Sequence, residues 1–446
     1  MSEQLIAVSG CCKAFPMPEG KGEFTVLESV DVTVARGEVV ALLGRSGSGK
    51  STLLRIMAGL IPASSGTITS SGKPLSGPNP DVGMVFQSFA LLPWLTVLEN
   101  VELGLEARGV RRTQRTKRAL KAIDLVGLDG FESAYPKELS GGMKQRVGFA
   151  RALVVEPKVL FMDEPFSALD VLTAENLRGE IDDLWNAGTF PAQSILIVTH
   201  NIDEAVFLAD RVIVLGANPG NVRGEVRIDL PRPHDRTDPR FKSLVEHLYT
   251  VMTNPTMEVA AQIVPGTASA GTAKAARSPY ARALPHVRVG TISGLLELIV
   301  ETHRDREEVA RLAERLALPI DDLLAILEAA VMLGFATVAD GVVTVTPVGA
   351  DFAQATILTS KDLFRRQALE HAPIVATIVK TLGEKENRSM RADFFLDLLD
   401  EYYPQDEAQR QFATAVDWGR YAELFEYDAD GGRLSLADGV ASAAGR

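Results

Sequence analysis

One segment of the chain has the residue types and spacing of a phosphate-binding loop. Residues 44–51 read Gly-Arg-Ser-Gly-Ser-Gly-Lys-Ser, in which four residues separate a glycine from Gly-Lys-Ser. Glycines let backbone N–H groups turn toward phosphate oxygens, while Lys50 and Ser51 can reach the terminal phosphates and a Mg²⁺ ion. The predicted nucleotide-binding residues of this loop are Gly44, Arg45, Ser46, Gly47, Ser48, Gly49, Lys50, Ser51 and Thr52.

Two acids follow an apolar run later in the chain. Asp163 and Glu164 come directly after Val159–Met162. A carboxylate beside a metal and a triphosphate stays ionised, so Asp163 suits Mg²⁺, directly or through water. Glu164 can then orient or deprotonate the attacking water. The alternative is a pair of acids that caps a strand in a turn, and it loses weight beside the phosphate loop.

Two further features carry a weaker signal. His200 follows the run Ile195–Thr199. A lone histidine is more often structural than catalytic. Its position favours a functional role, because α/β sheets bind ligands at the C-terminal ends of their parallel strands. The triplet 140–142, Ser-Gly-Gly, precedes a helical pattern over 143–153. Serine is a good N-cap and the glycines would let an anion approach, but by itself a plain capped helix explains the pattern better.

The elements that must position these residues follow an α/β pattern. Longer segments with helical spacing separate four continuous apolar runs, and such runs suit strands buried on both faces of a parallel sheet. We therefore predict a P-loop nucleoside triphosphatase fold over residues 1–258. The four runs are Val39–Leu43, Val159–Met162, Ile195–Val198 and Val212–Leu215.

The rest of the chain divides into a linker and a C-terminal region. Residues 267–279 are rich in small side chains, which favours a linker over 259–285, with a short Ala-rich helix as the alternative. Within 286–446, five residues between Pro319 and Gly334 recur 85 positions later and a sixth, Asp322, returns as Glu407, each time in a helix followed by two short strands. This predicts two winged-helix-like units, about 286–350 and 361–440, although two unrelated helical hairpins would fit nearly as well.

Composition restricts the class of protein. The 446 residues are 46% hydrophobic and 23% charged, as in a globular chain of two or three domains. The apolar runs are too short to cross a bilayer, the N-terminus lacks a secretory signal, and two adjacent cysteines make no disulfide framework, so we expect a cytosolic protein. The net charge is −12, and residues 286–446 hold 27 acidic and 16 basic side chains, which disfavours binding to a phosphate backbone.

Taken together and in this order, the motifs over residues 5–258 resemble the ATP-binding subunit of an ABC transporter. The order runs through the phosphate loop, Gln87, the signature Leu139–Arg146, the acidic strand end with Ser167–Asp170, and His200. The 163–170 stretch and the turn Ala217–Gly220 look most like the nitrate/sulfonate/taurine/bicarbonate importer branch. The resemblance implies an ABC-type ATPase with a helical subdomain, and ATP and Mg²⁺ as its ligands.

The resemblance also implies roles for single residues. Phe15 would stack on adenine. The catalytic residues would be Glu164, His200 and Gln87, and the Mg²⁺ ligands Ser51, Gln87 and Asp163. The signature residues that close on the opposite protomer's ATP would be Ser140, Gly141, Gly142 and Gln145, and Asp170 would couple the two sites.

The implied partners follow from the same family. The working unit would be a head-to-tail homodimer holding two ATP, peripheral on the cytoplasmic face of the cell membrane. A transmembrane permease subunit would insert a helix at Phe89–Trp94, for which a core-facing run is the alternative, and a separate substrate-binding protein would deliver cargo. ATP binding, dimer closure and hydrolysis would then drive import of a small anion such as nitrate, a sulfonate, taurine or bicarbonate; export stays open.

The C-terminal region resembles the AAA-associated-type domain appended to some members of that branch. We expect a regulatory or dimerisation module there and no nucleic-acid partner, because the would-be recognition helix Asp321–Leu333 carries three acids and no Lys or Arg. Two alternatives from other classes stay open. One is a nucleotide-switched regulatory ATPase that acts through its C-terminal module, and the other is a soluble ABC-class ATPase acting on DNA or ribosomes.

Overall fold

The computed structural model describes residues 3–16, 23–216, 219–253, 283–303, 305–316, 318–385, 387–400, 402–429 and 431–437. The described residues up to Leu248 form one compact unit, and those from Tyr249 onward form a second. The predicted linker lies outside the described residues except for its last three, and so do the first two residues of the predicted Ala217–Gly220 turn. Within the described ranges, no helix combines the length and the apolar character that a bilayer span requires.

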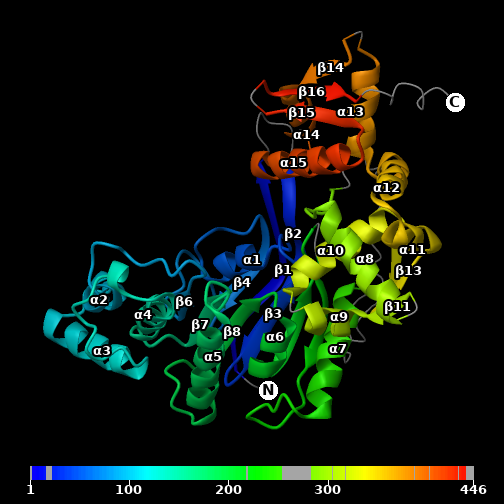
Figure 1. The fold of residues 1–446 in the computed structure, drawn as a ribbon. Coiled ribbons are helices and arrows are strands. Elements are labelled where there is room, and N and C mark those ends of the chain that lie inside the picture. The colour runs from blue at the N-terminus through cyan, green and yellow to red at the C-terminus, as the bar shows by residue number, and fades with distance from the viewer. Residues whose placement is uncertain are drawn as a thin grey trace. The chain divides into compact units, whose positions relative to one another are not determined.

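A six-stranded sheet forms the centre of the first unit (Figure 1). Its strand order is β10-β9-β3-β8-β7-β6, and every neighbouring pair is parallel except β10 with β9. The four predicted apolar runs all lie in this sheet, in strands whose residues are buried throughout, as a sheet covered on both faces requires. The strands are β3 (Val39–Gly44), β6 (Val82–Val85), β7 (Val159–Asp163), β8 (Ser194–Thr199), β9 (Arg211–Leu215) and β10 (Val222–Arg227).

An antiparallel sheet and four helices complete the nucleotide-binding part of this unit. The sheet has the order β2-β1-β4-β5, and its apolar side chains share one buried cluster with α1 and the central strands. Its strands are β1 (Gln4–Pro16), β2 (Glu23–Ala35), β4 (Ser65–Ser70) and β5 (Lys73–Pro74). The helices are α1 (Lys50–Met57), α5 (Val171–Asn186), α6 (Ile202–Leu208) and α7 (Pro239–Thr253), whose residues from Tyr249 onward belong to the second unit.

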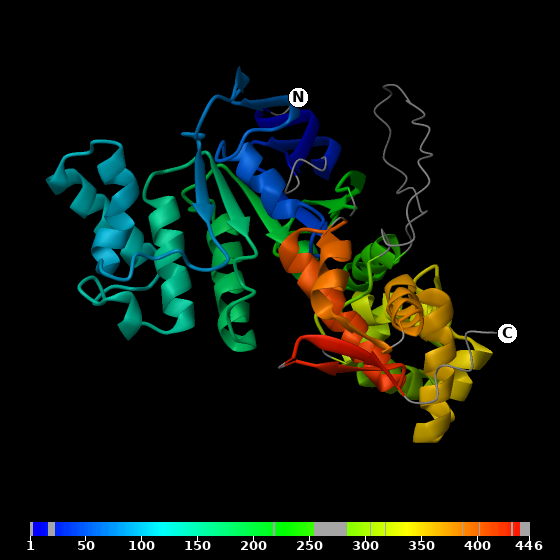
Figure 2. The same cartoon turned by 90° about the horizontal axis from the view of Figure 1, so that it is seen from above.

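Three helices form a separate helical subdomain to one side of the sheet (Figure 2). They are α2 (Val97–Ala107), α3 (Arg112–Leu125) and α4 (Gly141–Leu153), and each packs on the other two. Helix α2 begins at a capping box, in which Thr96 and Glu99 satisfy each other's backbone N–H groups. The expected ABC-type fold with a helical subdomain is therefore confirmed.

The second unit repeats one topology twice. In each repeat a helix, a short strand, two helices and a two-stranded hairpin follow one another, and the three strands form sheets of the same order, β11-β13-β12 and β14-β16-β15. This is the plan of a tandem winged helix, so the alternative of two unrelated helical hairpins is wrong. Helices α11 (Pro347–Gln354) and α12 (Ile357–His371) lie between the repeats in sequence.

The elements of the two repeats correspond one to one. The first contains α8 (Val289–His303), β11 (Arg306–Glu308), α9 (Val309–Leu316), α10 (Ile320–Met332), β12 (Ala336–Ala339) and β13 (Val342–Val345). The second contains α13 (Pro373–Gly383), β14 (Ser389–Arg391), α14 (Ala392–Asp400), α15 (Gln405–Tyr421), β15 (Phe425–Asp428) and β16 (Arg433–Leu436).

Buried aromatic rings join the two repeats into one core. Phe335 stacks on Phe352 with ring centroids 4.5 Å apart, and Phe364 lies 6.3 Å from Phe335 and 5.8 Å from Trp418. All four rings are at most 1% exposed. Because the chain of contacts runs from the first repeat through α11 and α12 to α15, we expect the repeats to unfold together.

Helix α15, the third helix of the second repeat, is covered on one face by the chain itself. The Gln411 side chain accepts from the backbone N–H of Leu284 (2.7 Å) and donates to its carbonyl (3.0 Å). Trp418 Nε1 donates to the carbonyl of Val287 (2.8 Å). The segment 284–287 is thereby bonded to the buried side of α15, on which Gln411 and Trp418 lie.

We predict that Gly349→Ala destabilises the second unit by about 1–3 kcal/mol. A Cβ at Gly349 would overlap the carbonyl group of Phe335, a backbone group that cannot move away cheaply. Gly294→Ala in α8 is the matched control, since nothing lies within 4 Å of a Cβ there and alanine favours a helix by up to about 1 kcal/mol. Thermal unfolding measures both, and a Gly349→Ala protein that melts with the wild type would contradict this packing.

Candidate functional site

The phosphate loop joins β3 to α1, and two of its glycines are sterically required. Gly49 has φ +88°, and a Cβ there would lie 2.6 Å from a methyl group of Leu27. A Cβ at Gly44 would lie 2.7 Å from Ser48 Oγ and 2.9 Å from the carbonyl oxygen of Leu215. These two positions therefore need glycine for the loop to close around a ligand.

Lys50 lies at the centre of this loop and is only 4% exposed. Its Nζ donates to the carbonyl oxygens of Gly44 (2.7 Å) and Arg45 (3.0 Å), and lies 4.0 Å from Glu164 Oε1. Ser48 Oγ is buried without a hydrogen-bond partner in the part of the chain that the structure describes. A buried ammonium beside a buried, unsatisfied hydroxyl at a helix N-terminus fits a phosphate group.

Ser51 and Asp163 form the pair that could hold a cation. Ser51 Oγ donates to Asp163 Oδ1 at 2.8 Å, and Asp163 is 6% exposed at the end of β7. Burial raises the pKa of Asp163, and the neighbouring Glu164 charge adds to that rise, against the hydrogen bond from Ser51. A hydroxyl and a carboxylate this close fit Mg²⁺, which takes few protein oxygens and prefers waters and phosphates for the rest.

Glu164 is held between two other predicted catalytic residues. Gln87 Nε2 donates to Glu164 Oε2 at 3.3 Å, and His200 Nδ1 lies 3.3 Å from the same oxygen. The hydrogen bond with His200 keeps the pKa of Glu164 below its ordinary value, although burial acts in the opposite direction. Near neutral pH this carboxylate is therefore ionised and able to accept a proton.

These three residues come from three neighbouring strands. Gln87 follows β6, Glu164 follows β7 and His200 follows β8, and β8 pairs with β3, which leads into the phosphate loop. The structure thus brings the predicted catalytic group and Lys50 together at one edge of the sheet. His200, for which a structural role was the more common case, lies in this group.

The signature residues lie at the N-terminus of α4 and have a different environment. Ser140 is the N-cap and accepts from the backbone N–H of Met143 at 3.3 Å, and Gly141 beside it is exposed. Gly142 packs against the Thr173 methyl group, so a Cβ there would overlap it. Asp170 is exposed at the N-cap of α5, where hydrogen bonding to Thr173 lowers the pKa of its carboxyl.

The position of Gln145 differs from the one expected for a residue that contacts a second ATP. Its side chain is 0% exposed, and its Nε2 donates to the carbonyl of Pro165 at 2.7 Å. Because Pro165 directly follows Glu164, Gln145 connects the signature helix to the strand end that carries the predicted base. In this conformation it supports the position of that strand end and reaches no outer surface.

Two aromatic residues lie opposite each other on the paired strands β1 and β2. Phe15 and Phe24 face each other in the β1–β2 register, are 39% and 37% exposed, and Lys13 Nζ lies 4.7 Å from the Phe15 ring centroid. Both rings are thus accessible for stacking. The segment Phe89–Trp94 contains no buried residue, and Trp94 is 69% exposed, so the core-facing alternative for this segment is wrong.

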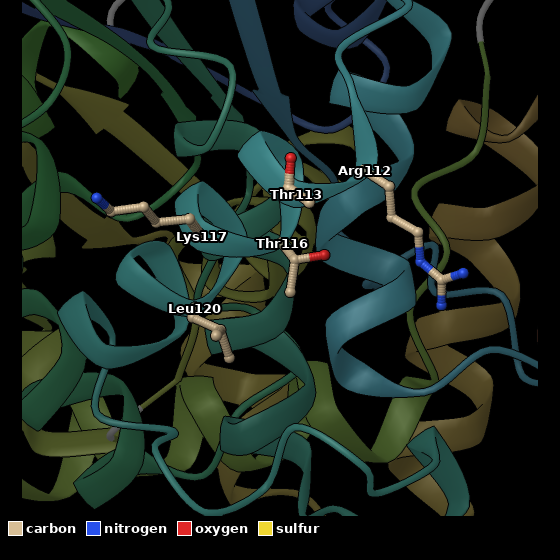
Figure 3. A pocket seen from close by; sticks show the side chains of 5 residues that line it. All are labelled: Arg112, Thr113, Thr116, Lys117 and Leu120. Carbon is tan, nitrogen blue, oxygen red and sulfur yellow. The ribbon is translucent and has the colours of Figure 1, made fainter.

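A hollow on α3 does not belong to this site (Figure 3). It has a volume of about 540 Å³ and is lined by Arg112, Thr113, Thr116, Lys117 and Leu120, none of them a predicted site residue. The side chains of Arg112 and Lys117 extend in different directions there. A ligand pocket needs convergent polar groups, which this hollow lacks.

Sequence reasoning missed several residues that support the site. Asn100 is fully buried in α2, accepts from the backbone N–H of Leu92 and donates to three carbonyls around the 92–96 turn. Arg151 and Glu204 lie in apolar stretches of α4 and α6. The sequence feature that could have identified them is a polar residue within an apolar helix face. This feature is a weak indicator, because many such residues are only surface groups.

Together, the phosphate loop, the cation pair and the base at the neighbouring strand ends define a P-loop nucleoside triphosphatase. Residues 27–167 match the family model for the ABC transporter, and residues 310–428 match the C-terminal AAA-associated domain. Among solved structures, the dimeric, ADP- and phosphate-bound ATP-binding cassette MJ0796 covers 50% of this chain and 98% of its own, at 32% identity and a TM-score of 0.45.

Three curated relatives match about half of this chain and most of their own length. The nitrate import ATP-binding protein NrtD of Synechocystis sp. is 48% identical over 49% of this chain and 82% of its own. The taurine import ATP-binding protein TauB of Burkholderia pseudomallei is 42% identical over 54% and 94%. The aliphatic sulfonates import ATP-binding protein SsuB of Bacillus licheniformis is 43% identical over 50% and 87%. The chain belongs to the ATP-binding subunits of the ABC transporter family, in the branch that contains these import proteins, and carries an additional AAA-associated domain.

We predict that ionisation of Glu204 makes the stability of the first unit depend on pH. Burial raises the pKa of Glu204 from 4.5 to about 7, against the opposing effects of Arg178 and Thr199. Because the folded-state pKa is the higher one, this contribution is complete below about pH 4.5 and is lost as the pH rises through about 7. Between pH 5 and 8, wild type should lose on the order of 1–3 kcal/mol more than Glu204→Gln.

Urea unfolding followed by circular dichroism at several pH values between 5 and 8 measures this difference. Equal pH slopes for the wild type and Glu204→Gln would contradict the buried, protonated carboxyl.

Proposed function

We propose that this chain is the ATP-hydrolysing subunit of an importer for a small anion such as nitrate, a sulfonate, taurine or bicarbonate. The observation that carries the proposal is the convergence of Gln87 and His200 on the Glu164 carboxylate, beside Lys50. These side chains are the groups needed to position and deprotonate a water molecule at a terminal phosphate. The substrate class rests on the names of the relatives, which are nitrate, taurine and aliphatic sulfonate import proteins.

In the proposed reaction the chain's own groups hold the triphosphate and move one proton. The loop amides and Lys50 bind the phosphates, and Glu164 orients the attacking water and accepts its proton. His200 stabilises the ionised Glu164 and contacts the terminal phosphate. Ser51, Asp163 and Gln87 would hold Mg²⁺, which neutralises charge on the phosphates when bound.

The proposed working unit is a homodimer that closes on two ATP molecules. Ser140, Gly141 and Asp170 are exposed, whereas the catalytic group lies at the ends of buried strands. An exposed helix N-terminus with two glycines offers backbone donors to a phosphate held by a second copy. Closure therefore joins each phosphate loop to the other copy's signature, and Asp170 couples the two sites.

The remaining partners are proposed from the same family membership. A transmembrane permease subunit holds the pore and contacts Phe89–Trp94, a separate substrate-binding protein supplies the anion, and the ATPase stays peripheral on the cytoplasmic face of the inner membrane. We divide the chain into the ATPase (1–258), a linker (259–285) and a regulatory or dimerisation domain (286–446). The excess of acidic side chains in residues 286–446, 27 against 16 basic ones, supports a role without nucleic acid.

We expect Glu164→Gln to bind ATP normally but to hydrolyse it at least about 100-fold more slowly, because the amide cannot accept the proton of water. With ATP this variant should accumulate as a closed dimer on gel filtration. Lys50→Ala is the matched variant for the binding step, and it should lose ATP affinity because the phosphates lose their buried cation. Full ATPase activity in Glu164→Gln would remove Glu164 from the role of base.

Recovery of the wild-type chain from detergent-solubilised host membranes should yield a multi-spanning protein in stoichiometric amount, identified by mass spectrometry. Trp94→Ala should lower that recovery about tenfold or more, as removal of a central aromatic contact does. Leu358→Ala removes another exposed apolar side chain, 75% exposed in α12, and should leave recovery unchanged. A purely soluble partner would contradict the transporter proposal and favour a nucleotide-switched regulator.

A further inference from the structure

Helix α4 carries a second feature at the end opposite to the signature. Arg151 Nη2 donates to the carbonyl oxygen of Phe89 at 2.9 Å, and its Nη1 donates to the carbonyl oxygen of Ala90. One turn earlier on the same face, a Cβ at Gly148 would lie 3.8 Å from the Phe89 carbonyl oxygen. The C-terminal half of the signature helix therefore faces the backbone of residues 89–90.

The turn that Arg151 holds is conformationally unfavourable on its own. Phe89 has φ +60° and Ala90 has φ +48°, and two successive non-glycine residues in the left-handed region need outside contacts to stay there. In the part of the chain that the structure describes, Arg151 hydrogen-bonds to the carbonyls of Phe89 and Ala90, and burial lowers the pKa of its guanidinium. A partly buried guanidinium that makes both of these hydrogen bonds holds the two carbonyls of the turn in place.

The turn lies between the two ends of one functional segment, residues 87–95. At one end Gln87 contacts Glu164, and at the other end Asn100 fixes the backbone around Leu92, next to the exposed Trp94. Arg151 attaches the middle of this segment to α4. A displacement of α4 at its signature end would therefore be carried to Gln87 through the 89–90 turn.

We propose that Arg151 is a positioning residue for ATP hydrolysis, which holds the Phe89–Ala90 turn against α4 so that the signature helix and Gln87 move together. The inference rests on the proposed function, because it assigns to Arg151 a task in the same catalytic cycle. Arg151 touches neither the phosphate loop nor Glu164, so it acts only through the segment 87–95.

The test uses the purified full chain and Arg151→Lys, which keeps the positive charge but cannot donate to both carbonyls in one planar fork. We expect hydrogen exchange in a peptide covering residues 86–92 to rise about tenfold or more, with exchange in 143–150 unchanged. We also expect kcat for ATP to fall about tenfold while KM stays within about twofold, because the loop that binds phosphate is untouched.

Arg118→Gln is the matched control. This arginine, in α3, also donates to a backbone carbonyl, that of Val154 just beyond α4, and pairs with Glu156, but it does not contact the segment 87–95. It should leave both measurements at the wild-type value. Wild-type exchange and kcat in Arg151→Lys would overturn the proposal, and so would faster exchange throughout α4, which would mean that Arg151 only stabilises the helix.

The two proposals fail in different ways. If the wild-type chain does not hydrolyse ATP at all, the proposed function fails, whereas the exchange experiment still decides whether Arg151 holds the turn. If the wild type hydrolyses ATP and Arg151→Lys changes exchange but not kcat, the proposed function stands and the positioning role is overturned.

Discussion

The site depends on the parallel pairing of four neighbouring strands. The register places Leu43 beside Thr199 and Asp163 beside Val198, so β3, β7 and β8 end within a residue of one another. The carboxyl ends of parallel strands all lie at the same edge of the sheet. The residue that follows each strand therefore lies at that edge without the need for a long loop. A slip of one residue in any of these pairs would turn a catalytic side chain to the opposite face of the sheet.

At this edge of the sheet, two adjacent acidic residues have pKa values shifted in opposite directions. Asp163 and Glu164 are consecutive, yet burial raises the pKa of the first and the hydrogen bond with His200 lowers that of the second. The raised pKa marks a carboxylate that gains from a bound cation, and the lowered one marks a carboxylate that stays ionised without it. Environments that separate the pKa values of neighbouring groups are typical of acid–base sites, and here one step along the backbone is sufficient.

Sequence alone predicted the parts of this site that are local in the chain. The phosphate loop, the acids after β7 and the four buried strands depend on short windows, in which residue type and period suffice. The position of His200 beside Glu164 needed the strand order, which no local pattern contains. The burial of Gln145 and the clamp formed by Arg151 depend on how α4 packs, and an isolated helix pattern carries no information about its neighbours.

The second unit illustrates how little a fold decides about function. Its topology is that of a winged helix used twice, a plan that in many proteins presents its third helix to DNA. In this chain the corresponding helix of the first repeat, α10, is acidic in its first turn. In α15, the corresponding helix of the second repeat, Gln411 and Trp418 bond the backbone of residues 284–287 on its buried side. The aromatic contacts from Phe335 to Trp418 join the two repeats through one buried core. The excess of acidic side chains in residues 286–446 sets up a negative field that repels a polyanion, whatever the topology of the unit.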